Sequence, residues 1–146
     1  MSLRQSIIQA IQVAVQEIRD PKPVLVTTEP FEADKLAITQ FPAVLISFID
    51  EERESVTMGT SGVGRRTGQI QIEVRGFVRG TELDKRRNDL LNAVENAIDA
   101  DRYLGLKASG VLDSQIRLIE TVPRLAPLAE IRIVVRVNYN YLRGAQ

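Results

Sequence analysis

The 146-residue sequence carries 19 basic and 19 acidic side chains and contains neither cysteine nor histidine. Zero formal net charge argues against a protein whose main task is to hold nucleic acid, because that affinity comes mostly from an excess of Lys and Arg. The lack of Cys and His excludes disulfides, thiolate nucleophiles, Cys/His zinc sites and catalytic triads that use His as the base. Apolar residues make up 44% and charged residues 26% of the chain, as in an ordinary globular protein.

The length fits a single domain over residues 1–146. A chain of this size can bury roughly two thirds of its unfolded surface, so one core is enough without disulfides. The N-terminal residues contain no apolar run long enough for a signal peptide or a membrane span. We therefore expect a cytoplasmic protein, or a component of a particle that is assembled in the cytoplasm.

The first expected element is an amphipathic helix that starts after Ser2. Ser2 and Gln5 have the spacing of a capping box, in which each side chain satisfies the other residue's free backbone N–H group. One apolar face follows at helical spacing: Ile7, Ile8, Ile11, Ala14, Val15 and Ile18. Asp20-Pro21 is expected to end the helix, since proline disfavours helical geometry in the residue before it. We expect this face to pack on a sheet, and contact with a neighbouring subunit is the alternative.

Residues 24–28 and 41–49 are β-branched or continuously apolar and predict two strands, with a loop over residues 30–40 between them. The acidic run that follows consists of Asp50, Glu51, Glu52 and Glu54. Its spacing fits no calcium loop, and we interpret it as a solvated strand end. Residues 55–58 predict a strand that returns to pair with residues 43–49.

Residues 59–68 hold four glycines, with Arg65 and Arg66 between the last two. The stretch lacks the Gly-Lys-Ser/Thr ending of a phosphate-binding P-loop, and a strand rather than a helix follows it. We predict a long flexible loop at 59–68. An arm that becomes ordered on a partner is a further hypothesis for this loop.

The central unit of the chain runs from residue 67 to residue 98 as strand, turn and helix. Ile70, Ile72 and Val74 alternate with polar residues, which places apolar groups on one face of a strand. A helix that is capped by Thr81 with Asp84 follows. Its apolar face consists of Leu83, Leu90, Leu91, Val94, Ala97 and Ile98.

Lys85, Arg86 and Arg87 lie near the start of this second helix, where cations are mildly unfavourable beside the helix dipole. Pairing of Arg87 with Asp84 and of Lys85 with Asp89 at helical spacing is expected to offset part of this effect. The cluster is either a charged solvent face or a contact surface.

Residues 116–120 predict a further strand, and residues 123–127 predict a loop. The longest alternation in the chain follows at residues 131–141, where every second residue is apolar. Together the elements predict an α+β fold, with a mostly antiparallel β-sheet of about four to six strands and two main helices packed on one face.

This order of elements resembles the tail-terminator (tail-completion) proteins of long-tailed bacteriophages and of related contractile injection systems. The likeness covers most of residues 3–142 and is carried by the apolar pattern of residues 89–101, by Val94-Glu95 within it, and by Leu104-Gly105 after it. The resemblance implies a non-enzymatic virion protein that forms a homo-hexameric ring. Such a ring caps the tail tube, stops its polymerisation and joins the tail to the neck or head connector, and in contractile tails it can also touch the sheath.

The resemblance implies no cofactor, and its partners are further copies of the chain, the tail-tube protein, the neck or connector protein and the sheath protein. No membrane partner and no sequence-specific nucleic acid is expected. Contacts between charges of mixed sign would suit a chain with balanced charge. Our candidate interface residues are Glu51, Glu52, Arg53, Arg65, Arg66, Lys85, Arg86 and Arg87.

Three alternatives compete with this interpretation. The first is another neck or baseplate adaptor of a phage or injection machine. The second is a small carboxylate-dependent enzyme that uses Asp50, Glu51 or Glu54, which would need a pocket with one raised pKa. The third is a nucleic-acid binder, although aromatic residues for stacking are only 5% of the chain. Its candidate residues are Arg65, Arg66, Arg75 and Arg79.

Overall fold

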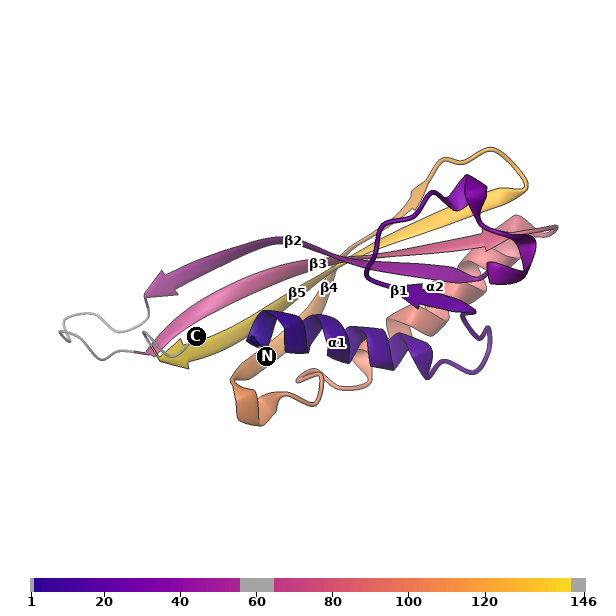
Figure 1. The fold of residues 1–146 in the computed structure, drawn as a ribbon. Helices are drawn as coiled ribbons and strands as arrows, with labels where there is room; N and C mark the ends of the chain where they lie inside the picture. The colour runs from indigo at the N-terminus through magenta and orange to yellow at the C-terminus, as the bar shows by residue number, and fades with distance from the viewer. Residues whose placement is uncertain (1, 56–64, 143–146) are drawn as a thin grey trace.

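The computed structural model of the chain describes residues 2–55 and 65–142 (Figure 1). Two helices, α1 (Leu3–Gln16) and α2 (Leu83–Asp99), accompany a five-stranded sheet with the order β1-β2-β3-β5-β4. Its strands are β1 (Leu25–Thr27), β2 (Ala43–Ser55), β3 (Arg65–Arg79), β4 (Val111–Val122) and β5 (Leu128–Leu142). Three short 3-10 helices are η1 (Ala33–Lys35), η2 (Ile38–Gln40) and η3 (Lys107–Ser109). The predicted α+β class is confirmed, and only the β1–β2 pair is parallel among these strands.

The β3–β5 ladder forms the centre of the sheet. It runs without a register shift from the Arg65–Leu142 pair to the Arg79–Leu128 pair. Because paired residues share a face, Ile70, Ile72 and Val74 of β3 lie on the same side as the apolar set of β5. That set is the predicted one and is buried or half-buried throughout: Ile131, Ile133, Val135, Val137, Tyr139 and Tyr141.

Both helices pack on this face and share one core with it. The predicted apolar faces of both helices are confirmed. The buried residues of α1 are Ile7, Ile11 and Val15. Those of α2 are Leu90, Val94 and Ile98. Gly76 of β3 lies against Leu90 of α2. A Cβ atom on Gly76 would lie 2.9 Å from both Leu90 Cδ2 and Ile131 Cγ1, so a larger residue there would force these core side chains to move.

A smaller core lies on the face of the sheet opposite the helices, near the end at which β3 leads into α2. Its buried members are Ala33, Ala43, Leu45, Phe77 and Leu128. The segment between β1 and β2, which contains η1 and η2, covers this core (Figure 1). Phe31 of that segment packs its ring edge-on to Phe77, with centroids 5.3 Å apart.

Several predicted boundaries in the first half of the chain are wrong. The Ser2 cap is confirmed, since its side chain accepts the Gln5 N–H group, but α1 ends at Gln16 and not at Asp20. After Gln16 the backbone forms a tighter turn, in which the Ile18 N–H group donates to the carbonyl of Val15, three residues earlier. β2 continues through the acidic run to Ser55 because β3 pairs with it along this whole length, so β3 and not residues 55–58 is the partner of residues 43–49. Residues 56–58 lie outside the described part.

The predicted loop at 59–68 is wrong in its last four residues, which belong to β3, and residues 59–64 lie outside the described part. Gly68 is a packing glycine in the strand. A Cβ atom on Gly68 would lie 2.3 Å from Cζ of Tyr139, so only glycine leaves room for this ring.

Two boundaries in the second half also differ. The N-cap position of α2 is Glu82, not Thr81, and the Glu82 side chain makes no capping hydrogen bond. Glu82 adopts a left-handed conformation with φ of 53° before the helix starts at Leu83. β4 is longer than residues 116–120 because β5 pairs with it from Val111 to Val122. Irregularities at Leu112 and Arg117 shift the register and interrupt the alternation that the prediction relied on.

Glu130 offers a test of the packing around Phe77. Its carboxylate is fully buried and accepts hydrogen bonds from Arg75 Nε at 2.7 Å and Arg124 Nε at 2.8 Å. We expect Glu130→Gln to lower the free energy of unfolding by about 2 kcal/mol, because the amide cannot accept from both guanidinium groups. Urea denaturation measures this change. The matched control is Glu120→Gln at an exposed ion pair, and equal effects of the two substitutions would contradict this role of Glu130.

Candidate interaction surfaces

The sheet is much longer than the helices that cover it. α1 and α2 have 14 and 17 residues, so they measure about 21 Å and 25 Å. The 15 residues of β3 extend about 50 Å. One end of β2, β3 and β5 therefore projects beyond the start of α1 (Figure 1). We call this end, residues 50–53, 66–69 and 138–141, the sheet tip.

Glu51 is the centre of a polar cluster at the sheet tip. Its side chain is only 9% exposed and accepts hydrogen bonds from Arg4 Nε at 2.7 Å, from Arg53 Nε at 2.9 Å and from the Tyr139 hydroxyl. Arg53 also lies over the ring of Tyr141, 4.7 Å from its centroid. The cluster joins the start of α1 to β2 and β5, so it clamps the helix layer to the projecting strands.

The clamp controls the ionisation of its members. Burial opposes the charged form of Glu51, but the hydrogen bonds from Tyr139, Arg4 and Arg53 outweigh it and lower the pKa of this carboxyl. Burial and the bond to Glu51 raise the pKa of Tyr139 to about 12. The bond to Glu51 likewise raises the pKa of Arg53. Glu51 is thus held ionised by three donors and does not have the raised pKa that the enzyme alternative would require of it.

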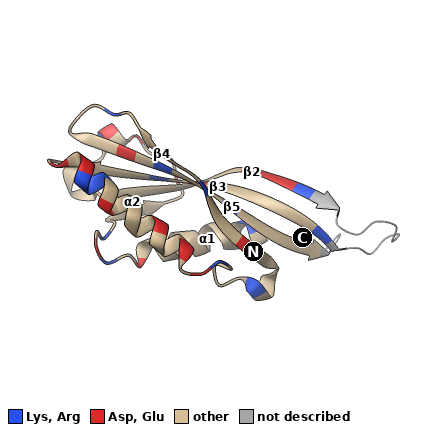
Figure 2. Ribbon diagram, turned by 180° about the vertical axis from the view of Figure 1, so that it is seen from behind, with Lys and Arg blue, Asp and Glu red and all other residues tan. Residues whose placement is uncertain are grey.

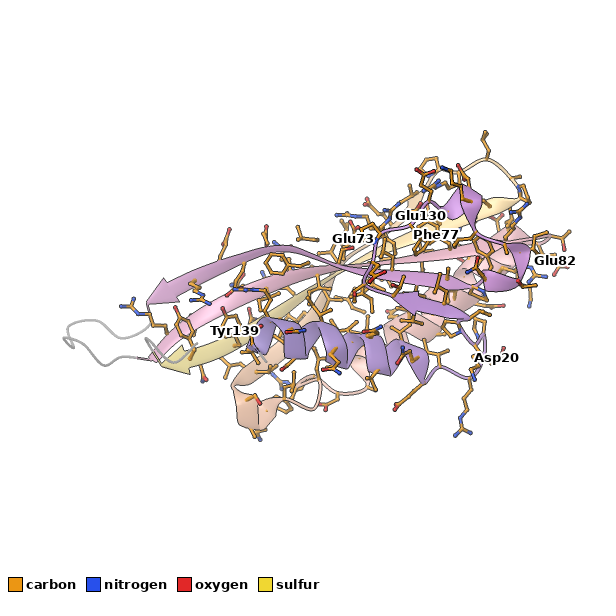
Figure 3. The ribbon with its side chains drawn as sticks, in the orientation of Figure 1. Asp20, Glu73, Phe77, Glu82, Glu130 and Tyr139 are labelled. Atoms are coloured by element: carbon orange, nitrogen blue, oxygen red, sulfur yellow. The ribbon has the colours of Figure 1, made fainter. Side chains whose placement is uncertain are left out.

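A second network lies on the sheet face opposite the helices. Arg132 of β5 bridges Glu73 of β3 and Glu120 of β4, the latter at 2.7 Å, and Arg75 binds Glu130. Glu73 and Glu130 are labelled in Figure 3. The hydrogen bonds to these carboxylates raise the pKa values of Arg75 and Arg132. Arg75, one of the candidate residues of the nucleic-acid alternative, is thus engaged by the carboxylate of Glu130.

The candidate interface residues fall into two groups at opposite ends of the molecule (Figure 2). Glu51, Glu52, Arg53 and Arg66 lie at the sheet tip, with Glu52 and Arg53 exposed and Glu51 and Arg66 partly buried. Arg65 starts β3, and its side chain is outside the described part. Lys85, Arg86 and Arg87 lie at the start of α2, beyond the other end of β3.

The start of α2 shows the expected charge pairs. Lys85 Nζ lies 3.3 Å from Asp89 Oδ2, and Arg87 lies 2.8 Å from Asp84 Oδ1. Arg86 Nε donates to the Thr81 carbonyl at 2.6 Å. We call Lys85, Arg86 and Arg87 the basic end. About 33 Å of β3, from Gln69 to Arg79, separate it from the sheet tip.

Sequence reasoning missed Arg4 and Tyr139, which complete the Glu51 cluster. Arg4 lies 47 positions from Glu51 in the chain, so no local pattern connects them. Tyr139 did carry a signal. Its place in the apolar alternation of β5 buries a hydroxyl, and a buried hydroxyl requires a hydrogen-bond partner.

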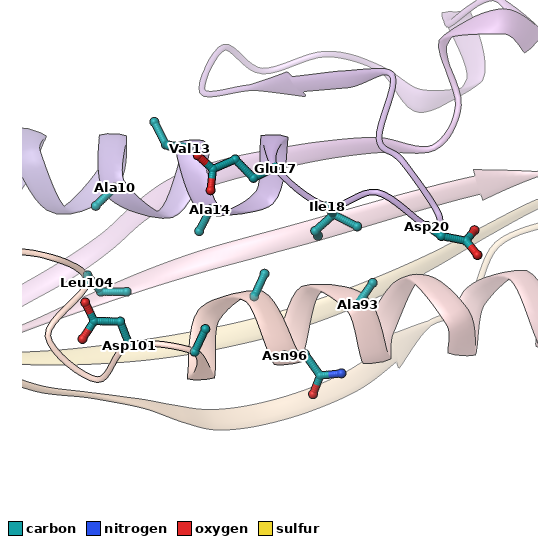
Figure 4. A pocket seen from close by; sticks show the side chains of 12 residues that line it. Ala10, Val13, Ala14, Glu17, Ile18, Asp20, Ala93, Asn96, Asp101 and Leu104 are labelled. Atoms are coloured by element: carbon teal, nitrogen blue, oxygen red, sulfur yellow. The ribbon is translucent and has the colours of Figure 1, made fainter.

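A groove of about 610 Å³ runs between α1 and α2 (Figure 4). Alanines at positions 10, 14, 93 and 97 line it, with carboxylates from Glu17, Asp20 and Asp101. Asp101 accepts the backbone N–H groups of Tyr103 and Gly105 at 2.9 Å and 2.8 Å, so it organises the turn after α2. Within residues 2–55 and 65–142, no group of three or more acidic side chains is placed to hold a metal ion. Neither helix of this described part is long and apolar enough to cross a bilayer.

The sequence matches no protein-family profile and no curated protein. Its fold is similar to that of a chain in the solved structure titled "Virion of native gene transfer agent (GTA) particle", with a TM-score of 0.51 and 10% sequence identity. The similarity covers 96% of this chain and 96% of that chain. At this identity the likeness is one of fold.

The Glu51 clamp predicts a dependence of stability on pH. Because the pKa of Glu51 is lowered in the folded protein from its ordinary value of 4.5, the cluster stabilises the fold above this value and the stabilisation is lost as the pH falls through the lowered pKa. Glu51→Gln removes this contribution. We therefore expect the variant to be less stable at about pH 6 but to lose less stability than the wild type on acidification to about pH 3.

Thermal denaturation across this pH range measures the effect. Glu52→Gln, an exposed position one residue along β2, is the matched control and should follow the wild type. A Glu51→Gln curve parallel to the wild-type curve would contradict the role of the clamp.

Proposed function

We propose that the chain is a structural protein of a phage-like particle, and that it forms a ring that caps the tail tube and joins it to the neck or head connector. The observation that carries this proposal is the fold likeness to a virion chain over 96% of both chains. The tail-terminator pattern of residues 89–101 supports the same class of protein. The clamped Glu51 supports a non-enzymatic role, because the hydrogen bonds that this carboxylate accepts join α1, β2 and β5 to one another.

The two ends of the molecule support a ring with two working faces. If the long strands run roughly along the ring axis, the sheet tip of every copy lies on one rim and the basic end lies on the other. One rim then carries Glu52, Arg53 and Arg66, and the other carries Lys85 and Arg86. The charges at the two rims would direct docking and select partners more than they would add affinity.

This arrangement would stop tube growth by geometry. Heterologous contacts around a closed ring use up the lateral surface of every copy. One rim docks on the last ring of tail-tube subunits, and the other presents a different surface that the next tube subunit does not fit. The partners are accordingly the tail-tube protein, the neck or connector protein and, in a contractile tail, the sheath protein. A neck adaptor would have the same fold likeness and is separated from the terminator by the experiment below.

Electron microscopy tests the proposed function directly. We expect the purified protein to form rings in negative stain. The family resemblance implies hexamers, and light scattering measures the mass of the rings. Antibodies against the chain should label particles at the junction of tail tube and neck. Labelling at the baseplate end would contradict the terminator role, and a protein that remains monomeric at high concentration would contradict the ring.

A charge reversal tests the assignment of the rims. We expect Lys85→Glu to leave the ring intact but to weaken docking at one rim by about tenfold, because it places a like charge against the complementary surface. Sedimentation with purified tail tubes and with connector protein shows which partner is affected. Lys107→Glu, an equal charge change in η3, is the control, because η3 lies beside the sheet tip, where the Gly110 carbonyl accepts the Asn140 N–H group, and not beside the start of α2. Equal losses with the same partner in both variants would contradict the assignment.

A further inference from the structure

The sheet has two free edges at matching heights. β1 covers the outer edge of β2 only opposite Ala43–Leu45, so in the described part no strand pairs with that edge from Ile46 onward. β4 forms the other edge, and its outer side has no strand partner among the described residues. A long free edge is a template for another chain, and stable monomers usually protect it.

Apolar side chains are exposed along both free edges. Phe48 and Ile49 of β2 are 42% and 40% exposed, and Leu112, Leu118 and Ile119 of β4 are 41% to 43% exposed. They account for five of the nine large apolar side chains that are exposed in the described part. Apolar groups on an unpaired edge favour association, so these edges have the chemistry of an interface.

The register of the sheet places the two open stretches at the same height. Across the sheet, Ile46 is level with Ile119 through Val74 and Ile133, and Arg53 is level with Val111 through Gly68 and Tyr139. The open edge of β2 is thus level with residues 111–119 of β4.

The stretch of β2 that β1 covers is level with the rest of β4. Leu45 is level with Glu120, and Ala43 is level with Val122. β1 therefore blocks the β2 edge only at the level of residues 120–122 of β4. The open part of the β2 edge is level with the remaining residues of β4, 111–119.

The strand directions also agree. β2 is antiparallel to β3, β3 to β5 and β5 to β4, so β2 and β4 run in opposite directions. A second copy can be generated by rotation about a ring axis that runs parallel to the strands. Its β4 then lies beside β2 of the first copy in antiparallel orientation, and the helix faces of the two copies lie on the same side. Phe48 then lies level with Ile116 on that face. The irregularities at Ile49 and Arg117 lie within about one residue of each other in height, so pairing can continue on both sides of them.

We infer that the edge of β2 from Ile46 to Arg53 pairs with the edge of β4 from Val111 to Ile119 in a second copy of the chain. Because the two edges are different surfaces, the contact is heterologous and repeats from copy to copy until it closes. The inference names the lateral contact of the ring and rests on the proposed function for its closure. Backbone hydrogen bonds would supply the pairing and the exposed apolar side chains would become buried.

Cysteine pairs test this contact in a chain that has no cysteine of its own. Phe48→Cys is combined in turn with Ser114→Cys, Ile116→Cys or Ile119→Cys, which lie on the helix face of β4 and span the possible registers. Paired strands bring opposite Cα atoms to about 4.5–5.5 Å, which is within disulfide range. We expect at least one pair to give, on oxidation, a ladder of covalent oligomers beyond the dimer on a non-reducing gel.

The controls separate this contact from other associations. Phe48→Cys with Leu125→Cys, an exposed position in the β4–β5 connection, should give no ladder, and thermal denaturation verifies that each variant is folded. Dimers from Phe48→Cys alone would show that like edges meet, and would overturn the inference. Rings in the microscope with no ladder from any pair would also overturn it, while leaving the proposed function intact. A ladder from a protein that does not cap tubes would support the edge contact and contradict the proposed function.

Discussion

The β3–β5 ladder is the constraint on which the rest of the molecule depends. Its fifteen residue pairs run in register from Arg65–Leu142 to Arg79–Leu128, and they make the sheet about twice as long as either helix. Two helices can bury only part of one face of such a sheet. The uncovered parts are the sheet tip, the face opposite the helices and the two edges. The surfaces that remain for partners are thus consequences of strand length.

Two carboxylates, Glu51, which is mostly buried, and Glu130, which is fully buried, hold the layers together across this long sheet. Glu51 joins the start of α1 to β2 and β5, and Glu130 joins β3 to the connection before β5 beside the small core around Phe77. Each accepts hydrogen bonds from arginines. Removal of one partner is therefore expected to lower the free energy of unfolding strongly, although the intact cluster adds only modestly to it. The side chains whose pKa values are shifted by these contacts therefore act in holding the fold together. This agrees with the structural role that we propose.

Periodicity allowed much of the fold to be predicted from the sequence. The alternation of β5 and the apolar faces of both helices identified most of the main core, because each pattern is local and has one period. β4 was underestimated because two irregularities break its alternation. Residues 65–68 were assigned to a loop because Gly68 resembles a flexible glycine, whereas it makes room for Tyr139. The Glu51 cluster could not be predicted, because its members meet only when β2, β5 and α1 are assembled.

Amide hydrogen exchange, compared between dilute and concentrated protein, tests the central claim that the open edges are the lateral contact surfaces. Amides of β3 and β5 lie inside the sheet and should be protected in both states. The account predicts that concentration adds protection to Ile46–Arg53 and Val111–Ile119 together and leaves the α1–α2 groove unchanged. New protection in the groove, with both edges still exchanging freely, would contradict it.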